Sequence, residues 1–168
     1  MTRRRILFVC RAASSESAKS AQALAALDNV EVVTADVTDL ETLMTFADTS
    51  FERIVTTQET LLEIVAIANE RLGLPGLSVD VVRNTLDKSR LKSTLERAGH
   101  NVPRGRLVRD LTEVKRFADQ IGFPIILKSL TGSGALATFP LRNQQDLHRV
   151  SIQAVSYTHL TLPTICSV

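Results

Sequence analysis

The chain of 168 residues carries 20 Lys and Arg against 18 Asp and Glu, so that its formal net charge is only +2. This balance gives no broad basic surface and argues against a nucleic-acid partner. A hydrophobic content of 44% supports a soluble core in one domain or two small ones, and no apolar stretch is long enough to cross a membrane. Cys10 is the one cysteine outside the last fourteen residues, which excludes a disulfide framework and indicates a reducing compartment, the cytoplasm by default.

Helix-like and strand-like stretches alternate along the first half of the chain. Residues 5–10 are apolar on both faces, as in a buried parallel strand, and residues 61–72 present one broad apolar face, as in a helix. Gly73 then provides a helix C-cap, and Pro75-Gly76 a turn. The expected elements are strand 5–10, a helix from Ser14 or Ser15 to about 27, strand 30–33, helix 40–47, strand 53–56 and helix 61–72. This order predicts an α/β fold.

The second half begins at Asp87, which is placed to cap a helix from Lys88 to about Arg97 that ends at Gly99. The elements expected after it are strand 106–108, a helix from Thr112 to Ile121, strand 124–129, its hairpin partner 138–141 and a helix starting at Gln144.

Two lysines frame a buried strand and a glycine-rich loop in this half. Lys128 ends an apolar strand, and Lys88 lies forty residues upstream. A lysine ammonium supplies a point charge, and glycines let backbone N–H groups approach phosphate oxygens closely. The pattern therefore predicts a polyphosphate site formed by Lys88, Lys128, Thr131, Gly132, Ser133 and Gly134.

The arrangement resembles the ATP-grasp superfamily, and within it the ATP-dependent carboxylate–amine ligases, over residues 51–147. The most specific stretches are Asp87 to Pro103 and Ile121-Gly122-Phe123-Pro124, the latter leading to Lys128. In such ligases two lysines hold the phosphates of ATP, and a glycine loop folds over them. By position, these roles fall to Lys88, Lys128 and the loop 131–134.

The resemblance departs from the family pattern just after this loop. Ala135-Leu136-Ala137 stands where related proteins more often carry Ser or a further Gly. The loop 132–137 also fits the G-x-G-x-x-A dinucleotide fingerprint, but that motif needs a helix where Thr138-Phe139-Pro140 predicts a strand.

The resemblance also implies a domain organisation. Residues 1–86 would form a Rossmann-like pre-ATP-grasp domain, and residues 87–154 the first, small α+β lobe of a truncated ATP-grasp domain. Ligands of such a parallel sheet lie beyond the carboxyl ends of its strands, here residues 11–15 and 57–60. Thr57-Gln58-Glu59 would either shape the site for the carboxylate or amine substrate, or merely cap the helix that follows.

The last fourteen residues, 155–168, look like a translated sequencing adaptor. They contain no Asp, Glu, Lys or Arg in a chain that is 23% charged, and they follow a helix start at Gln144 that should lead into the rest of an ATP-grasp domain. We therefore expect this tail not to be native and the chain to be an N-terminal fragment. The alternative is a genuine Thr-rich edge strand.

The resemblance implies a reaction as well. Such ligases activate a carboxylate by its attack on the γ-phosphate of ATP, forming an acyl phosphate that an amine displaces. ATP and Mg²⁺ are the implied cofactors, with the metal ligands expected in a missing C-terminal half. The fragment itself is expected to be inactive, so no residue is assigned as catalytic or metal-binding; His100 and His148 lack ligand spacing. Two alternatives stay open: a non-catalytic nucleotide-binding module, and a fragment of a carbamoyl-phosphate or biotin-carboxylase-like ATP-grasp enzyme.

Overall fold

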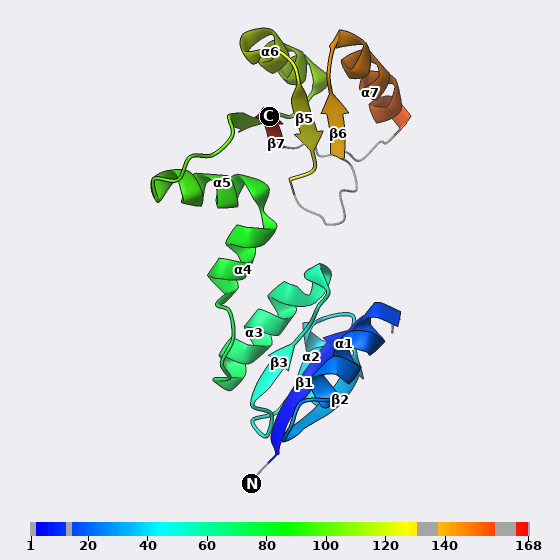
Figure 1. Ribbon diagram of the computed structural model, residues 1–168, viewed down its shortest axis with the longest axis vertical. Helices are drawn as coiled ribbons and strands as arrows, with labels where there is room; N and C mark the ends of the chain where they lie inside the picture. Colours follow the sequence, from blue (N-terminus) through cyan, green and yellow to red (C-terminus); the bar gives the residue numbers. More distant parts are fainter. Residues whose placement is uncertain (1–2, 13–14, 131–137, 157–163, 168) are drawn as a thin grey trace. The chain divides into compact units, whose positions relative to one another are not determined.

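Figure 1 shows the computed structural model, which describes residues 3–12, 15–130, 138–156 and 164–167, with the backbone alone beyond residue 150. The chain forms two compact units, Met1–Arg83 and Asn84–Val168. This boundary lies three residues before the division drawn from the sequence after residue 86. Among the described residues, no helix is both long enough and apolar enough to span a membrane.

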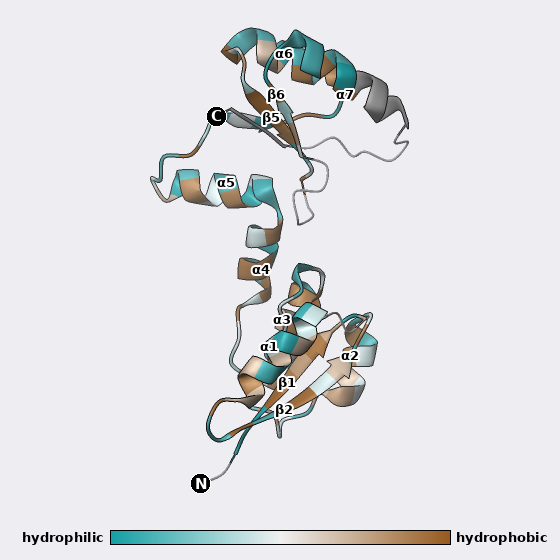
Figure 2. Ribbon diagram, turned by 45° about the vertical axis from the view of Figure 1, so that its right-hand side comes forward, coloured by the Kyte–Doolittle hydropathy of each residue, from teal (hydrophilic) through white to brown (hydrophobic). Residues whose placement is uncertain are grey.

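Unit 1 is built on a three-stranded parallel sheet in the order β2-β1-β3. The central strand is buried on both faces, because Leu7, Phe8 and Val9 are all at most 1% exposed. Figure 2 shows the apolar colouring of this strand. The elements of the unit are β1 (Arg4–Cys10), α1 (Ser15–Ala25), β2 (Val30–Asp36), α2 (Leu40–Phe46), β3 (Arg53–Val55), the 3₁₀ turn η1 (Glu59–Leu61) and α3 (Leu62–Leu72). Helix α4 (Val79–Leu86) contains the boundary between the two units. All strands and helices predicted for this half are present.

The main core of unit 1 lies on one face of this sheet. Leu7 and Ile54 of the sheet pack there against Leu43 of α2 and Val65 of α3, and all four are at most 6% exposed. Since side chains alternate along a strand, the neighbouring residues of β1 point to the opposite face, over which α1 lies. In α1 only Ser17 is buried.

Helix α4 is not predicted from the sequence. The Ser78 hydroxyl accepts a hydrogen bond from Val81 N (3.3 Å), and the Glu70 carboxylate accepts one from Val79 N (2.8 Å), so that two free N–H groups of the first turn are satisfied. A serine before an acidic first turn (Asp80) was the available signal. Gly73 ends α3 as predicted, in the left-handed conformation (φ +66°) that favours glycine.

Unit 2 contains a four-stranded sheet in the order β4-β7-β5-β6, in which every neighbouring pair is antiparallel. Its elements are α5 (Lys88–Arg97), β4 (Gly105–Leu107), α6 (Leu111–Ile121), β5 (Ile125–Lys128), β6 (Thr138–Leu141), α7 (Gln144–Ser156) and β7 (Thr164–Ser167). The hairpin of β5 with β6 is therefore confirmed. The core of the unit joins one face of this sheet to α6 and α7 through Ile125, Leu127, Leu141, Val114, Phe117, Leu147 and Val150.

Helix α6 begins one residue earlier than predicted. Its N-cap is Asp110, whose carboxylate accepts from Glu113 N (2.8 Å), whereas Thr112 was expected to open the helix. The Glu113 carboxylate in turn accepts from Arg109 N (2.9 Å), so two side-chain-to-backbone hydrogen bonds fix the first turn.

Strand β7 falls within the tail 155–168. It lies between β4 and β5, with Ile165 opposite both Arg106 and Leu127. It is thus a central strand of the structure rather than the edge strand considered above. The adaptor origin of the tail stays a prediction, because a backbone ladder does not record where a sequence came from.

Candidate functional site

The start of α5 lies against the chain just after β5, although α5 begins forty residues before β5 ends. Asp87 caps α5 as predicted, accepting from Ser89 N (2.8 Å) and Arg90 N (2.9 Å). The next residue, Lys88, donates its backbone N–H to Leu130 O (3.2 Å). This bond holds the first predicted phosphate lysine beside the point where the chain leaves β5.

Lys128 lies at the end of β5 on the face of the sheet away from α6 and α7. Ile125 and Leu127 are buried toward these helices, so strand alternation directs Ile126 and Lys128 to the opposite face. Lys128 is half-buried there, opposite Thr138 of β6. The predicted loop residues Thr131, Gly132, Ser133 and Gly134 lie outside the described residues, in the segment that joins Leu130 to Thr138.

The electrostatic contrast between the two units is hidden by the net charge of the whole chain. Residues 84–168 carry twelve Lys and Arg against six Asp and Glu, a net charge of +6, whereas residues 1–83 carry eight against twelve, a net charge of −4. A local excess of positive charge raises the concentration of polyanions near a surface. Unit 2 is therefore the unit suited to a polyphosphate. Its excess of positive charge is seen only when the charges of the two units are counted separately.

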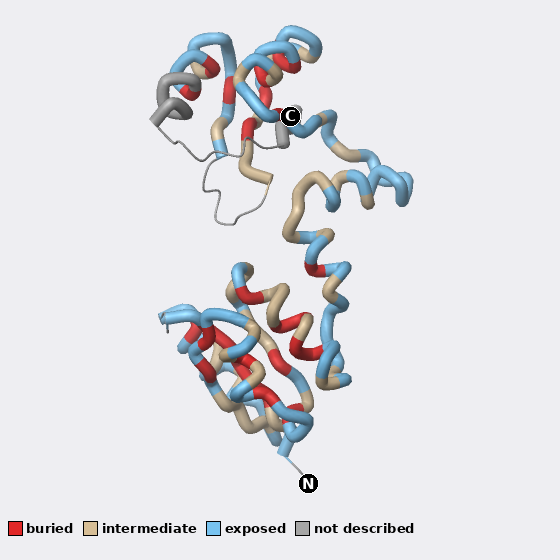
Figure 3. The backbone as a smooth tube through the Cα atoms, turned by 180° about the vertical axis from the view of Figure 1, so that it is seen from behind, coloured by how far each residue is buried: buried red, intermediate tan, exposed pale blue. Residues whose placement is uncertain are grey.

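Lys92 lies four residues after Lys88 on α5 and, unlike a typical surface lysine, is largely covered. Its ammonium donates to Pro103 O (2.6 Å) and to Glu96 Oε1 (2.8 Å), and its side chain is only 17% exposed. It therefore ties the segment after α5 back onto the helix. The rest of α5 is poorly covered: Figure 3 shows no buried residue along it.

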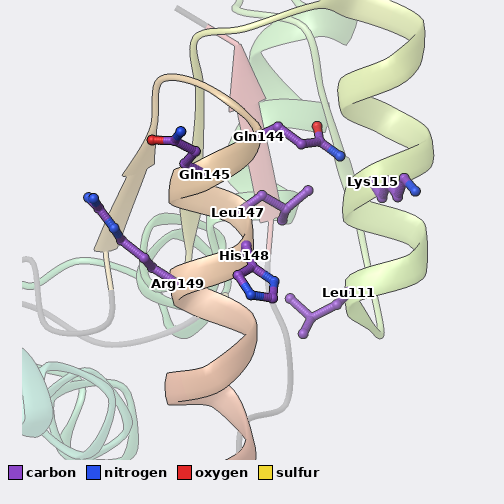
Figure 4. Close-up of a pocket in the computed structure, with 7 residues that line it drawn as sticks. All are labelled: Leu111, Lys115, Gln144, Gln145, Leu147, His148 and Arg149. Atoms are coloured by element: carbon purple, nitrogen blue, oxygen red, sulfur yellow. The ribbon is translucent and has the colours of Figure 1, made fainter.

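A hollow on unit 2 does not coincide with the predicted phosphate residues. It is a groove of about 670 Å³ between α6 and α7. Figure 4 shows His148 and Leu111 facing each other across it, while Arg149 extends away from α6. Because this groove lies on the helix-covered side and Lys128 lies on the other side of the sheet, we do not assign it to a nucleotide.

The carboxyl edge of the unit 1 sheet is held by Gln58. Its side chain makes no capping hydrogen bond to η1, whereas Glu59 does lie in the first turn of η1. Instead its amide accepts from Arg11 N (2.8 Å) and donates to Arg11 O (3.1 Å) and to Ser17 Oγ (3.2 Å). Asp36 accepts from Ala12 N (3.1 Å) on the other side. The turn after β1 is thus clamped from both neighbouring strands.

A metal site is a separate question. In the part of the chain that the structure describes, no three His, Cys, Asp or Glu side chains lie close enough together to hold a metal ion.

Comparison with known proteins extends the resemblance. Residues 87–164 match the family model for the ATP-binding domain of the carbamoyl-phosphate synthase L chain. The chain is 28% identical over 85 residues to the carbamoyl phosphate synthase large chain of Kocuria rhizophila, a match that covers 51% of this chain and 8% of that protein. It is 34% identical over 77 residues to alanine–anticapsin ligase of Bacillus subtilis, covering 46% of this chain and 16% of that protein.

Among solved structures, the RimK-domain ATP-grasp protein of Sphaerobacter thermophilus has a similar fold. The TM-score is 0.73 at 18% sequence identity, and the match covers 98% of this chain and 63% of that one. The chain thus spans less than a fifth of these curated relatives and less than two thirds of this solved neighbour. Residues 87–164, which include α5 and Lys128, are thus similar to the ATP-binding domain of the carbamoyl-phosphate synthase L chain, and the chain has the fold of an ATP-grasp protein.

Proposed function

We propose that the chain is part of an ATP-dependent carboxylate–amine ligase that works through an acyl phosphate. Residues 87–154 would form the phosphate-binding small lobe, and residues 1–86 a Rossmann-like domain that precedes it. The observation that carries the proposal is the hydrogen bond from Lys88 N to Leu130 O, which brings the two lysine-bearing segments together. The relatives that share this region, a carbamoyl phosphate synthase and an alanine–anticapsin ligase, support the same assignment.

In this proposal the two lysines stabilise the negative charge of the phosphates. Phosphoryl transfer to a carboxylate places negative charge on the transferring group and on the leaving ADP, and fixed cations stabilise that charge. Lys128 would reach the phosphates from the face of the sheet away from α6 and α7, and Lys88 from the start of α5. The loop Thr131–Gly134 would add backbone N–H donors. Mg²⁺ supplies further charge neutralisation when it is bound in such enzymes, with ligands outside the described residues.

The carboxyl edge of unit 1 would take part in substrate binding. The turn after β1 is fixed by Gln58 and Asp36, and a fixed backbone lowers the cost of ordering a site around a small substrate. The substrates would be a small carboxylic acid and an amine, joined in the cytoplasm.

The test is ATP binding to the 168-residue chain, measured by calorimetry for the wild type and for Lys88→Ala and Lys128→Ala. Each substitution should weaken binding about tenfold to a hundredfold, because a hydrogen bond to a charged group contributes roughly 1.5–3 kcal/mol. Lys115→Ala is the matched control, since Lys115 lines the groove between α6 and α7 on the other side of the sheet.

Unchanged affinity in both lysine variants would overturn the phosphate assignment. Micromolar affinity of the chain by itself would favour the alternative of a self-sufficient, non-catalytic nucleotide-binding module.

A further inference from the structure

Helix α5 carries Lys88, yet little apolar packing holds this helix to the rest of unit 2. None of its residues is buried, and its two leucines, Leu91 and Leu95, are each 36% exposed. Helix α6, by contrast, buries three of its residues. Since most of the stability of a helix in a protein comes from packing of its apolar face, the position of α5 depends strongly on its polar contacts.

Two polar contacts hold α5 at separate points. At its first residue, Lys88 N donates to Leu130 O (3.2 Å), just after β5. One turn later, the Lys92 ammonium donates to Pro103 O (2.6 Å), two residues before β4. The first contact ties the helix to the chain that leaves β5, and the second ties it to the chain that enters β4.

Of the two contacts that Lys92 makes, the one with Pro103 fixes the helix. The other joins Lys92 to Glu96 Oε1 (2.8 Å) within α5 itself, and an i,i+4 ion pair with a half-exposed carboxylate contributes little. The bond to Pro103 O reaches outside the helix, and its charged donor is only 17% exposed. Charge-assisted hydrogen bonds are roughly twice as strong as neutral ones, so this bond is well suited to restrain α5.

The same contacts set Lys92 apart from a phosphate ligand. Lys88 and Lys92 lie four residues apart and therefore on one face of the helix. To bind a phosphate oxygen, however, the Lys92 ammonium would have to leave both a backbone carbonyl and a carboxylate. Its contacts serve the placement of the helix.

We propose that Lys92 is a positioning residue of the phosphate site, which holds the first turn of α5 through Pro103 and thereby fixes where the Lys88 side chain can reach. The inference rests on the proposed function, since that function assigns Lys88 to the phosphates of ATP. A binding group has to be held within about 0.5 Å of its productive position. A helix with no buried residue cannot ensure this by packing alone.

The first measurement uses no nucleotide and follows hydrogen exchange of backbone amides by NMR. The Lys88 amide should exchange about threefold to tenfold faster in Lys92→Met, which keeps the length of the side chain and removes the ammonium. Lys92→Arg, whose guanidinium can still donate to Pro103 O, should restore slow exchange. Glu96→Gln, which leaves the bond to Pro103 in place, should change the rate little. The amides of α6 should exchange equally in all these variants, which separates a loss of position from a loss of stability of the whole unit.

The second measurement is the affinity for ATP, by calorimetry on the full chain. Lys92→Met should weaken binding about fivefold, and Lys92→Arg should recover most of the loss. Lys115→Met removes the same charge from α6 and should change the affinity by less than about twofold. In the background of Lys88→Ala, Lys92→Met should have no further effect, because the ammonium that Lys92 positions is absent.

An unchanged exchange rate of the Lys88 amide in Lys92→Met would overturn the proposal. So would independent losses of affinity in the double variant, which would mean that Lys92 meets the nucleotide directly. A wild-type chain that does not bind ATP would instead contradict the proposed function, and the exchange rates would still decide whether Lys92 holds the start of α5.

Discussion

Asn69 closes one edge of the unit 1 sheet with its side chain alone. β3 is an edge strand, and the buried amide of Asn69 accepts from Ile54 N (3.1 Å) and donates to Ile54 O (3.0 Å). It thereby supplies the two hydrogen bonds that a further strand would otherwise make. Buried backbone groups without a partner are costly, which explains why an amide stands at this helix position at only 3% exposure.

Asn69→Ala should therefore lower the free energy of unfolding of unit 1 by about 2–3 kcal/mol, because it leaves a buried donor and a buried acceptor unsatisfied. The measurement is urea unfolding followed by circular dichroism. Gln22→Ala, at an exposed position of α1, is the control and should change the free energy by less than about 0.5 kcal/mol. A cost for Asn69→Ala as small as that of the control would contradict the role given to the amide.

Gly76 is coupled to Asn69. A Cβ added at Gly76 would lie 3.0 Å from Asn69 Nδ2, and the two hydrogen bonds to Ile54 prevent that amide from moving aside. Gly76→Ala should cost about 1–2 kcal/mol in the wild type and less in Asn69→Ala, where Nδ2 and Cγ are removed and only the Cβ at position 69, 3.2 Å from the added Cβ, remains. A double-mutant cycle measures the difference, and strictly additive costs would show that the contact is not responsible.

Asp39 makes the stability of unit 1 depend on acid. Hydrogen bonds from the backbone N–H of Thr42, and next from the Thr38 hydroxyl, lower the pKa of its carboxyl group. A folded-state pKa below the unfolded value means that the contribution is present above the unfolded pKa and is lost as the pH falls through the folded one. Asp39→Asn, which keeps an acceptor for Thr42 N, should make the decrease of melting temperature below about pH 4 shallower. An unchanged acid slope would assign the pH dependence to other groups.

At the scale of elements, the sequence was sufficient to predict helix ends at which a residue satisfies backbone groups of its near neighbours. Asp87, Gly73 and Gly99 were predicted as helix ends and are helix ends, because caps depend on neighbours in sequence. The contacts of Asn69 with Ile54 and of Gln58 with Arg11 were not predicted. They join residues brought together only by the fold, and an asparagine or glutamine in a sequence does not indicate which backbone group it will meet.

For the candidate site too, the residues could be predicted from the sequence, whereas their contacts could not. Composition and spacing indicated Lys88 and Lys128, but their proximity was implied by the resemblance, since no local pattern links residues forty positions apart. Lys92 shows the converse: on the helix surface it resembles any exposed lysine, and only the fold brings Pro103 O to its ammonium.

The cap of α6 gives a direct test of how elements are specified. Asp110→Ala removes the acceptor of Glu113 N and should cost about 1 kcal/mol, as is typical for the loss of an N-cap. Thr112→Ala, at the position that the sequence suggested, should be within about 0.5 kcal/mol of the wild type. Thermal unfolding of unit 2 distinguishes the two, and the reverse order of costs would restore Thr112 as the start of the helix.

At the scale of the whole molecule, charge is divided between the two units. The net charge of +6 on residues 84–168 and −4 on residues 1–83 should make ATP binding weaken with added salt, since screening reduces attraction between exposed charges. Raising the salt from 50 to 500 mM should lower the affinity several-fold, with a slope that decreases in Lys128→Ala. An affinity independent of salt would mean that the excess positive charge of unit 2 does not act on the nucleotide.

The tail provides the other whole-molecule question, because its sequence looks foreign while β7 occupies the middle of a sheet. A foreign sequence can occupy this position if the gap between β4 and β5 accepts any extended backbone, whatever its side chains. Strand β7 pairs with β4 and β5 through main-chain groups, and Thr and Ile favour extended structure. In the described residues β7 is the only strand paired with β4, whereas β5 also pairs with β6.

A chain ending at residue 156 should therefore lose hydrogen-exchange protection at β4 and along the facing edge of β5, with unit 1 unchanged. Ile165→Pro should reproduce this loss, since proline has no N–H to donate, and Ile165→Thr should keep the protection because the ladder remains. Full protection of β4 in the shortened chain would show that β7 contributes nothing to the sheet. Loss of protection in Ile165→Thr would show instead that the gap between β4 and β5 selects a side chain, which a sequence of foreign origin would have no reason to match.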